Sequence, residues 1–211
     1  MFSSPPFEDR TDAGERLAAE LRDRGVEADL VLAIPRGALP LGRAVADGLD
    51  APLDVVVAKK VGAPGNQEYA IGAVASDGSL WRNERAIRQT GADEEYFERE
   101  RDTVAAAARE KLERYRGEGT PPDVAGKTVV VVDDGVATGS TMRACLTQVR
   151  NGGAERVVVA VPVGPPDTVD ELGEVADEVV CLETPRNFRG VGQFYRRFGQ
   201  VTDEEAMAYL E

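Results

Sequence analysis

The four valines at positions 129–132, followed directly by Asp133 and Asp134, constrain the fold of this 211-residue chain most. Consecutive β-branched apolar residues are typical of a strand that is buried on both faces. The turn over residues 135–141 is rich in glycine and hydroxyl side chains, and we expect a helix to begin at Ser140 or Thr141. A buried strand, an acidic pair and a helix N-terminus together predict an anion pocket beside a polyol or metal site.

The chemistry of this turn favours a phosphate group. Its N–H groups and the helix dipole attract anions. The hydroxyl groups of Thr138, Ser140 and Thr141 add further hydrogen-bond donors. Asp133 and Asp134 are placed to accept hydrogen bonds from sugar hydroxyls or to hold Mg²⁺, directly or through water.

Other phosphate-binding motifs fit this stretch less well. Gly135 and Gly139 do not form the Gly-x-Gly-x-x-Gly pattern of dinucleotide-binding folds, and no lysine follows Gly139 as a P-loop requires. A receiver domain also carries paired acids after a strand. The residues from Lys127 onward are too few to build one.

The stretch resembles the thirteen-residue motif with which type I phosphoribosyltransferases bind 5-phosphoribosyl 1-diphosphate (PRPP). The chain is similar in outline to that family over most of its length, especially to a branch described only as predicted phosphoribosyltransferases. The resemblance implies that Asp133 and Asp134 hold the ribose hydroxyls and, with Mg²⁺, belong to the catalytic site. It also implies a cradle for the 5-phosphate, made of Gly135, Ala137, Thr138, Gly139, Ser140 and Thr141.

A second group of candidate binding residues follows the strand expected at residues 28–34. Pro35, Arg36 and Gly37 come directly after it, at the edge where open α/β sheets bind ligands. The guanidinium fork of arginine bonds two oxygens of a diphosphate at once. This loop is similar to the pyrophosphate loop of the same family, so we expect Arg36 and Gly37 to meet the leaving diphosphate.

Lys59 and Lys60 are half of the four lysines in the chain, and we expect them to close a strand over residues 53–58. We favour them, Lys60 first, as cations for the diphosphate. Residues 61–67 are expected to form a loop, and a hairpin with its turn at Asp77-Gly78 follows. The segment 60–82 resembles the mobile loop and hairpin of the predicted-phosphoribosyltransferase branch, and such a loop closes over substrate.

The remaining periodicities complete an open, mostly parallel, doubly wound α/β sheet. We expect helices over residues 7–25, with Thr11 as N-cap, over 38–49 and over 93–116, the last with its charges in solvent. Further strands are expected at residues 156–163 and 178–182. The domain then comprises a core at 1–182 and a small C-terminal hood at 183–211.

The hood concentrates aromatic residues and ends in a helix capped by Thr202, with Glu205 at the capping-box position. Two interpretations remain open for its aromatic side chains: a satellite core, or a platform on which a planar acceptor stacks. The residues concerned are Phe188, Phe194, Tyr195 and Phe198.

Composition limits the partners. The net charge of −13 argues against binding to nucleic acid or to anionic membranes. Cys145 and Cys181 lie far apart in a chain without histidine, which indicates reduced thiols rather than a zinc site or a disulfide. The N-terminal residues do not show the pattern of a secretory signal, so we expect a cytoplasmic protein.

The resemblance implies transfer of the phosphoribosyl group to a nitrogen of a nucleobase-like acceptor, with small-molecule substrates and a homodimeric assembly. A general base is missing, because this chain has Ala137 where the 6-oxopurine enzymes carry an aspartate. The turn is similar to that of adenine-type enzymes instead, and Glu68 is a speculative substitute for the base. The alternatives are a PRPP-sensing regulator and a hydrolase of PRPP or nucleotides.

The acidic surface predicts adaptation to high salt. Stability and activity should increase between dilute buffer and molar KCl, because salt screens the repulsion among the 38 acidic side chains. Thermal unfolding at both salt concentrations measures this. Equal stability in dilute buffer would contradict the prediction.

Overall fold

The computed structural model describes residues 5–117 and 119–211, and its centre is a five-stranded parallel sheet. The strand order is β2-β1-β6-β7-β8. Their bounds are β1 (Leu30–Ala33), β2 (Leu53–Val55), β6 (Thr128–Val132), β7 (Arg156–Val163) and β8 (Glu178–Glu183). The central strand, β6, has no solvent exposure from Val129 to Val132, so the predicted buried strand and fold class are confirmed.

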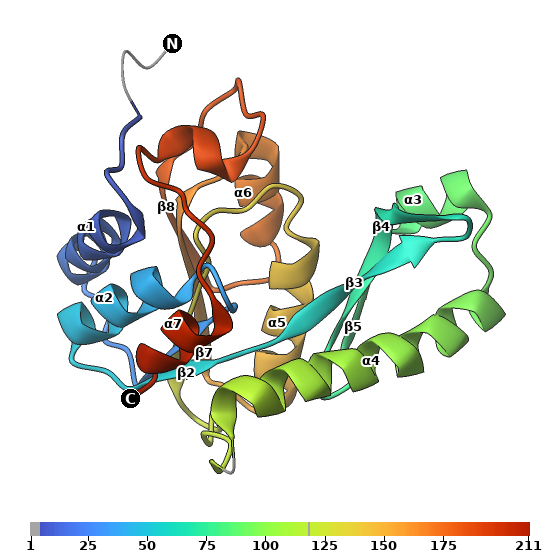
Figure 1. Ribbon diagram of the computed structural model, residues 1–211, viewed down its shortest axis with the longest axis horizontal. Coiled ribbons are helices and arrows are strands. Elements are labelled where there is room, and N and C mark those ends of the chain that lie inside the picture. The colour runs from blue at the N-terminus through green and yellow to red at the C-terminus, as the bar shows by residue number, and fades with distance from the viewer. Residues whose placement is uncertain (1–4, 118) are drawn as a thin grey trace.

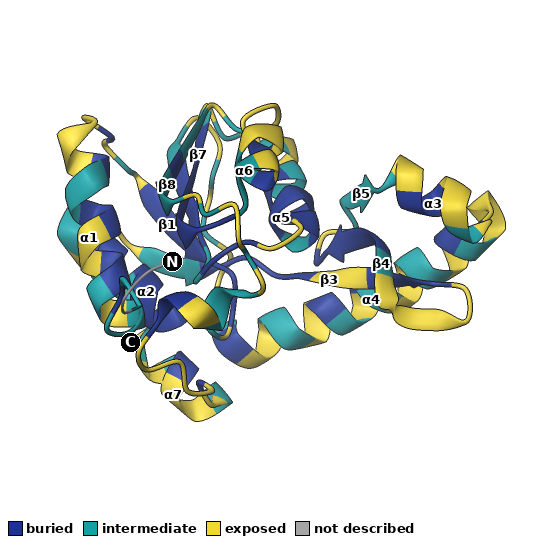
Figure 2. Ribbon diagram, turned by 90° about the horizontal axis from the view of Figure 1, so that it is seen from above, coloured by how far each residue is buried: buried dark blue, intermediate teal, exposed yellow. Residues whose placement is uncertain are grey.

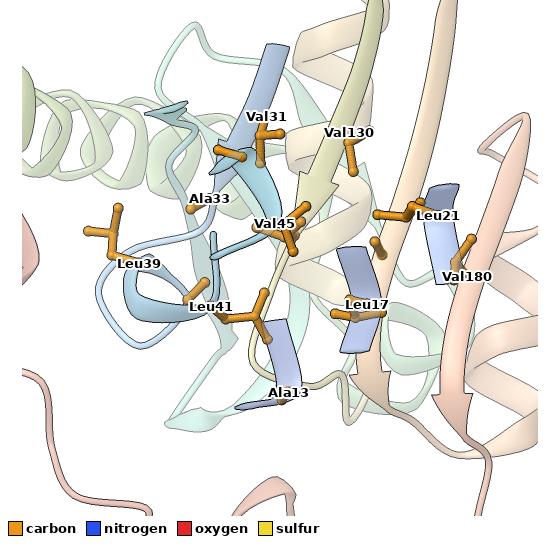
Figure 3. Close-up of a cluster of buried hydrophobic side chains, with 14 of the residues drawn as sticks. Ala13, Leu17, Leu21, Val31, Ala33, Leu39, Leu41, Val45, Val130 and Val180 are labelled. Carbon is orange, nitrogen blue, oxygen red and sulfur yellow. The ribbon is translucent and has the colours of Figure 1, made fainter. Parts of the chain in front are cut away.

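Helices cover both faces of this sheet (Figure 1). On one face lie α1 (Arg10–Asp23) and α2 (Leu39–Leu49), and on the other α5 (Ser140–Asn151) and α6 (Pro166–Leu172). Val130 packs with Leu17 and Leu41 of the first pair (Figure 3), whereas Val131 packs with the second. Successive valines of β6 thus point to opposite faces of the sheet and contribute to both hydrophobic cores. Burial of each valine stabilises the folded state by about 1.5–3 kcal/mol.

An arm extends away from the sheet (Figure 1). It combines the antiparallel sheet β3-β4-β5 with two helices and has its own core around Ile71 and Phe97. Exposed residues gather at its outer end (Figure 2). The bounds of its elements are β3 (Ala58–Ala63), β4 (Asn66–Ala75), β5 (Leu80–Arg82), α3 (Glu84–Thr90) and α4 (Glu94–Arg116).

The expected loop over residues 61–67 is wrong. Strand β3 continues to Ala63 and β4 begins at Asn66, so only two residues form the turn. The glycine signal reflects a register shift at Gly62, where a Cβ would lie 2.5 Å from the Cα of Gln67. Lys59 and Lys60 do not close the strand after residue 53 either, because β2 ends at Val55. The turn at Asp77-Gly78 is confirmed, with Gly78 at φ +90°.

The C-terminal segment returns across the sheet's edge to the start of α1. A short 3-10 helix (Val191–Phe194) precedes α7 (Asp203–Ala208), whose capping box between Thr202 and Glu205 is confirmed. Phe7 and Tyr195 form a backbone bridge.

Thr11 is not the N-cap of α1, because the carboxylate of Asp9 accepts the hydrogen bond from the backbone N–H of Asp12 at 3.1 Å. The first four residues of the N-terminal stretch, on which the argument against a secretory signal partly depends, lie outside the described residues. Within the described ranges, each helix is too short or too polar to cross a membrane.

Candidate functional site

The acid pair lies at the carboxyl end of β6, where the sheet meets α1 and the C-terminal segment. The Nε of Arg10 donates to the Oδ2 of Asp134 at 2.8 Å, and both side chains are largely buried, with 11% and 16% exposure. The hydroxyl of Tyr195 donates to the backbone carbonyl of Asp134 at 2.6 Å. Arg10 thus holds the carboxylate of Asp134 from α1, and Tyr195 holds its backbone carbonyl from the C-terminal segment.

Desolvation raises the pKa of both carboxyl groups. The pKa of Asp133 lies well above its ordinary value of 3.8, because burial disfavours the charged form and the neighbouring Asp134 adds repulsion. Burial also raises the pKa of Asp134, although the guanidinium of Arg10 opposes this. Paired carboxylates with raised pKa values are typical of a site that takes up hydroxyl donors or a cation.

A cavity of about 520 Å³ opens in front of the acid pair. Besides Asp133 and Asp134, its lining includes Gly37 and three of the four lysines of the chain, Lys59, Lys60 and Lys111. A Cβ on Gly37 would lie 2.5 Å from the Oδ2 of Asp134. Only glycine therefore lets the loop after β1 approach the acids so closely.

The turn after the acid pair forms a smaller cavity of about 190 Å³, lined by residues 135–142. Lys60, Asp133 and Thr141 line both cavities, so the two adjoin each other. Gly139 has φ +70° and caps α5, which begins at Ser140 as expected. The first N–H groups of a helix have no intrahelical acceptors, and this turn therefore provides donors to an anion.

Arg36 lies beside the main cavity rather than in its lining. Its side chain is 45% exposed, and its guanidinium faces Asp203 of α7 at 3.5 Å. Lys59 and Lys60 are exposed on β3. The structure thus brings both lysines to the acid pair, whereas Arg36 is held by a carboxylate of the chain itself.

The four aromatic residues of the hood divide into two groups. Phe194 and Tyr195 are buried, and Phe188 stacks on Phe194 with 5.8 Å between ring centroids. Phe198 is 38% exposed. The guanidinium of Arg10 lies over its ring, with Cζ 3.9 Å from the ring centroid. Phe194 and Tyr195 therefore contribute to a satellite core, and Phe198 is the exposed ring that contacts the acid pair's arginine.

The sequence did not point to two further side chains at this site, those of Arg10 and Lys111. The Nζ of Lys111, on α4, donates to the carbonyl of Pro35 at 2.6 Å. Burial lowers the pKa of Lys111, and the positive charges of Lys59 and Arg36 lower it further. The scarcity of lysine in the chain was a signal for Lys111, whereas Arg10 had none in its local sequence.

The donor set fits a metal ion that is shared with substrate. Among the described residues, no group of three or more acidic, histidine or cysteine side chains is arranged to hold a metal ion. Mg²⁺ commonly takes one or two carboxylates and fills its other positions with phosphate oxygens and water. Asp133 and Asp134 suit that role. Cys145 and Cys181 are both free cysteines in the structure.

Comparison with known proteins identifies the class. Residues 7–198 match the family model described as "Phosphoribosyl transferase domain". The chain belongs to this family.

Among its relatives is a protein of Mycobacterium tuberculosis named "Putative phosphoribosyl transferase Rv0571c", 42% identical over 97% of this chain. The match covers 46% of that protein, so the chain spans about half the length of the curated relatives it matches. The crystal structure of TT1426 from Thermus thermophilus is 46% identical, with a TM-score of 0.83 and 97% of both chains covered. A Staphylococcus aureus hypoxanthine phosphoribosyltransferase shares the fold, with 12% identity, a TM-score of 0.50 and coverage of 93% and 85%.

Replacing Asp133 by asparagine should stabilise the ligand-free protein at neutral pH. A carboxyl group whose pKa is raised on folding lowers stability as pH rises, because the native state binds more protons than the unfolded state. We expect a gain on the order of 1 kcal/mol, or ~2–4 °C in Tm. The gain should shrink as pH falls through the raised pKa toward 3.8.

Thermal unfolding at several pH values measures this effect. Glu15→Gln, at an exposed position on α1, is the control that removes one charge without desolvation. A lower Tm for Asp133→Asn at pH 7 would contradict the argument.

Proposed function

We propose that the protein is a Mg²⁺-dependent phosphoribosyltransferase that transfers the 5-phosphoribosyl group of PRPP to a nitrogen of a nucleobase-like acceptor. One observation carries the proposal: a cavity with paired carboxylates and lysines adjoins a second cavity formed by the turn at the N-terminus of α5. PRPP has the matching order of groups, a 5-phosphate, a ribose with two free hydroxyls and a diphosphate.

Each part of the site has a role in this proposal. Asp133 and Asp134 accept hydrogen bonds from the ribose 2- and 3-hydroxyls, and residues 135–141 surround the 5-phosphate. Lys60, followed by Lys59, neutralises the diphosphate at the mouth of the cavity. Gly37 admits the diphosphate close to the loop, and Arg36 leaves Asp203 to bind it. Lys111 adds a fourth cation from α4.

In the reaction, the bond between ribose C1 and the diphosphate oxygen breaks, and a bond from C1 to the acceptor nitrogen forms. Mg²⁺, when bound with PRPP, supplies charge neutralisation to the leaving diphosphate. The chain's own residues orient the ribose, exclude water and stabilise the negative charge that develops on the leaving group.

The base that takes up the acceptor's proton is the open part of this mechanism. Ala137, in the phosphate turn, offers no carboxylate, and Glu68 lies exposed on β4. We propose that Phe198 borders the acceptor, because Phe194 and Tyr195 are buried and Phe188 stacks on Phe194. The homodimer and the cytoplasmic location that the sequence predicts remain proposals, and light scattering measures the first.

Diphosphate release from Mg-PRPP across a panel of nucleobases tests the activity. Release that depends on one base supports transfer, release without any base indicates a hydrolase, and tight PRPP binding without release indicates a sensor. The double substitution Asp133→Asn with Asp134→Asn should abolish PRPP binding, because the ribose hydroxyls and Mg²⁺ lose both negatively charged acceptors. Unchanged affinity in the folded double variant would remove the proposed ribose role.

The substitution Arg36→Ala tests the diphosphate role separately. We expect the affinity for PRPP and for diphosphate to fall about tenfold or more, because a hydrogen bond to a charged group contributes about 1.5–3 kcal/mol. Affinity for ribose 5-phosphate should change little. Arg36→Lys keeps the charge without the fork and should be intermediate. An equal loss for all three ligands would contradict this assignment.

A further inference from the structure

A second cavity, of about 480 Å³, lies between α4, α7 and the loop that follows β1. Four cationic side chains line it: Arg36, Lys59, Lys111 and Arg114. Two carboxylates, Glu110 and Asp203, oppose them. In a chain with a net charge of −13, this excess of positive charge in a concave surface stands out.

The contacts of Asp203 show which donors in this cavity are directed at an anionic group. Its Oδ1 accepts a hydrogen bond from the hydroxyl of Tyr115 at 2.6 Å, and Arg36 lies 3.5 Å from the same oxygen. The guanidinium of Arg114 contacts Oδ2 at 3.2 Å. Two guanidinium groups and a phenol around one oxyanion are the donors that also bind a phosphoryl group.

The remaining cations are not neutralised by carboxylates. Throughout residues 5–117 and 119–211, neither Lys59 nor Lys111 has a carboxylate oxygen within 4.0 Å. Burial and the charges of Lys59 and Arg36 lower the pKa of Lys111, which indicates mutual repulsion that an added anion relieves. Glu110 contacts Arg114 at 3.8 Å rather than either lysine, and Lys111 hydrogen-bonds only the uncharged carbonyl of Pro35.

We propose that this cavity is a second anion-binding site, which takes the phosphate or diphosphate group of a small molecule and in which the Asp203 carboxylate is an internal stand-in. The site shares Lys59 and Lys111 with the PRPP cavity, and it contains Arg36, to which the proposed function gives a diphosphate role. A ligand here therefore competes for the same cations and weakens PRPP binding, an effect that rests on the proposed function. The anion site itself does not.

The first experiment titrates inorganic diphosphate into the full chain without metal, with ribose 5-phosphate saturating the phosphate cradle. Arg114 lines the second cavity and not the PRPP cavity. We expect Arg114→Ala to weaken diphosphate binding about tenfold. Arg101→Ala, on the same helix with its ion pair to Glu98, is the matched control and should change nothing. Binding that is indifferent to Arg114→Ala overturns the proposal.

Substitution of Asp203 should act in the opposite direction. Asp203→Asn removes the competing carboxylate and should tighten diphosphate binding about two- to fivefold, the range of a partly exposed ion pair. A lower Tm with unchanged affinity would mean that Asp203 only docks α7 on α4, and this overturns the proposal. Repeating the titration with ADP shows whether free diphosphate or a nucleoside diphosphate fits better.

The design separates this inference from the proposed function. The variant with Asp133→Asn and Asp134→Asn lacks the two carboxylates proposed to hold the ribose, yet it should keep the diphosphate binding that depends on Arg114. Loss of PRPP binding with retained diphosphate binding that Arg114→Ala still weakens supports two sites. Loss of both in the folded double variant overturns the second.

Discussion

Two carboxylates of like charge lie side by side directly after a strand that contains four buried valines. Burial and mutual repulsion both disfavour their ionised forms, and other parts of the chain compensate. Arg10 reaches Asp134 from 124 positions away in the sequence, and Tyr195 hydrogen-bonds its carbonyl from the hood. The placement of α1 and of the C-terminal segment is therefore linked to the geometry of this pair.

The lysines of the chain gather around the cavity that contains the acid pair. Three of its four lysines line the main cavity, although acidic residues dominate the surface. A net charge of −13 repels an anionic substrate at long range, whereas a local cluster of cations in a concave site attracts it at short range. Salt weakens the first effect more than the second, because exposed charges are screened more strongly than partly buried ones.

The parts of this site that the sequence predicted are local in the chain. The valine strand, the acid pair, the turn and the start of α5 follow one another within residues 129–141, so adjacent residues determine their conformation. The prediction of a loop over residues 61–67 was wrong because glycine and proline indicate a bulged hairpin as readily as a loop. The contacts of Arg10 and Lys111 depend on tertiary packing, which no local pattern encodes. Aromatic enrichment in the hood could not separate a satellite core from a stacking platform.

The loop after β1 is where the arm, the hood and the sheet meet. Lys111 of α4 holds the carbonyl of Pro35, Asp203 of α7 faces Arg36, and Asp134 lies against Gly37. Since α4 also packs on β3 and β4, a displacement of the arm relative to the sheet changes the position of Lys111 at this loop. An anion that draws Arg36 away from Asp203 likewise loosens the contact of α7. Under the proposed function, binding at the loop is thus linked to the arm through Lys111 and to α7 through Arg36, one of three side chains that contact Asp203. Each of these contacts is accessible to substitution without disturbing the valine core.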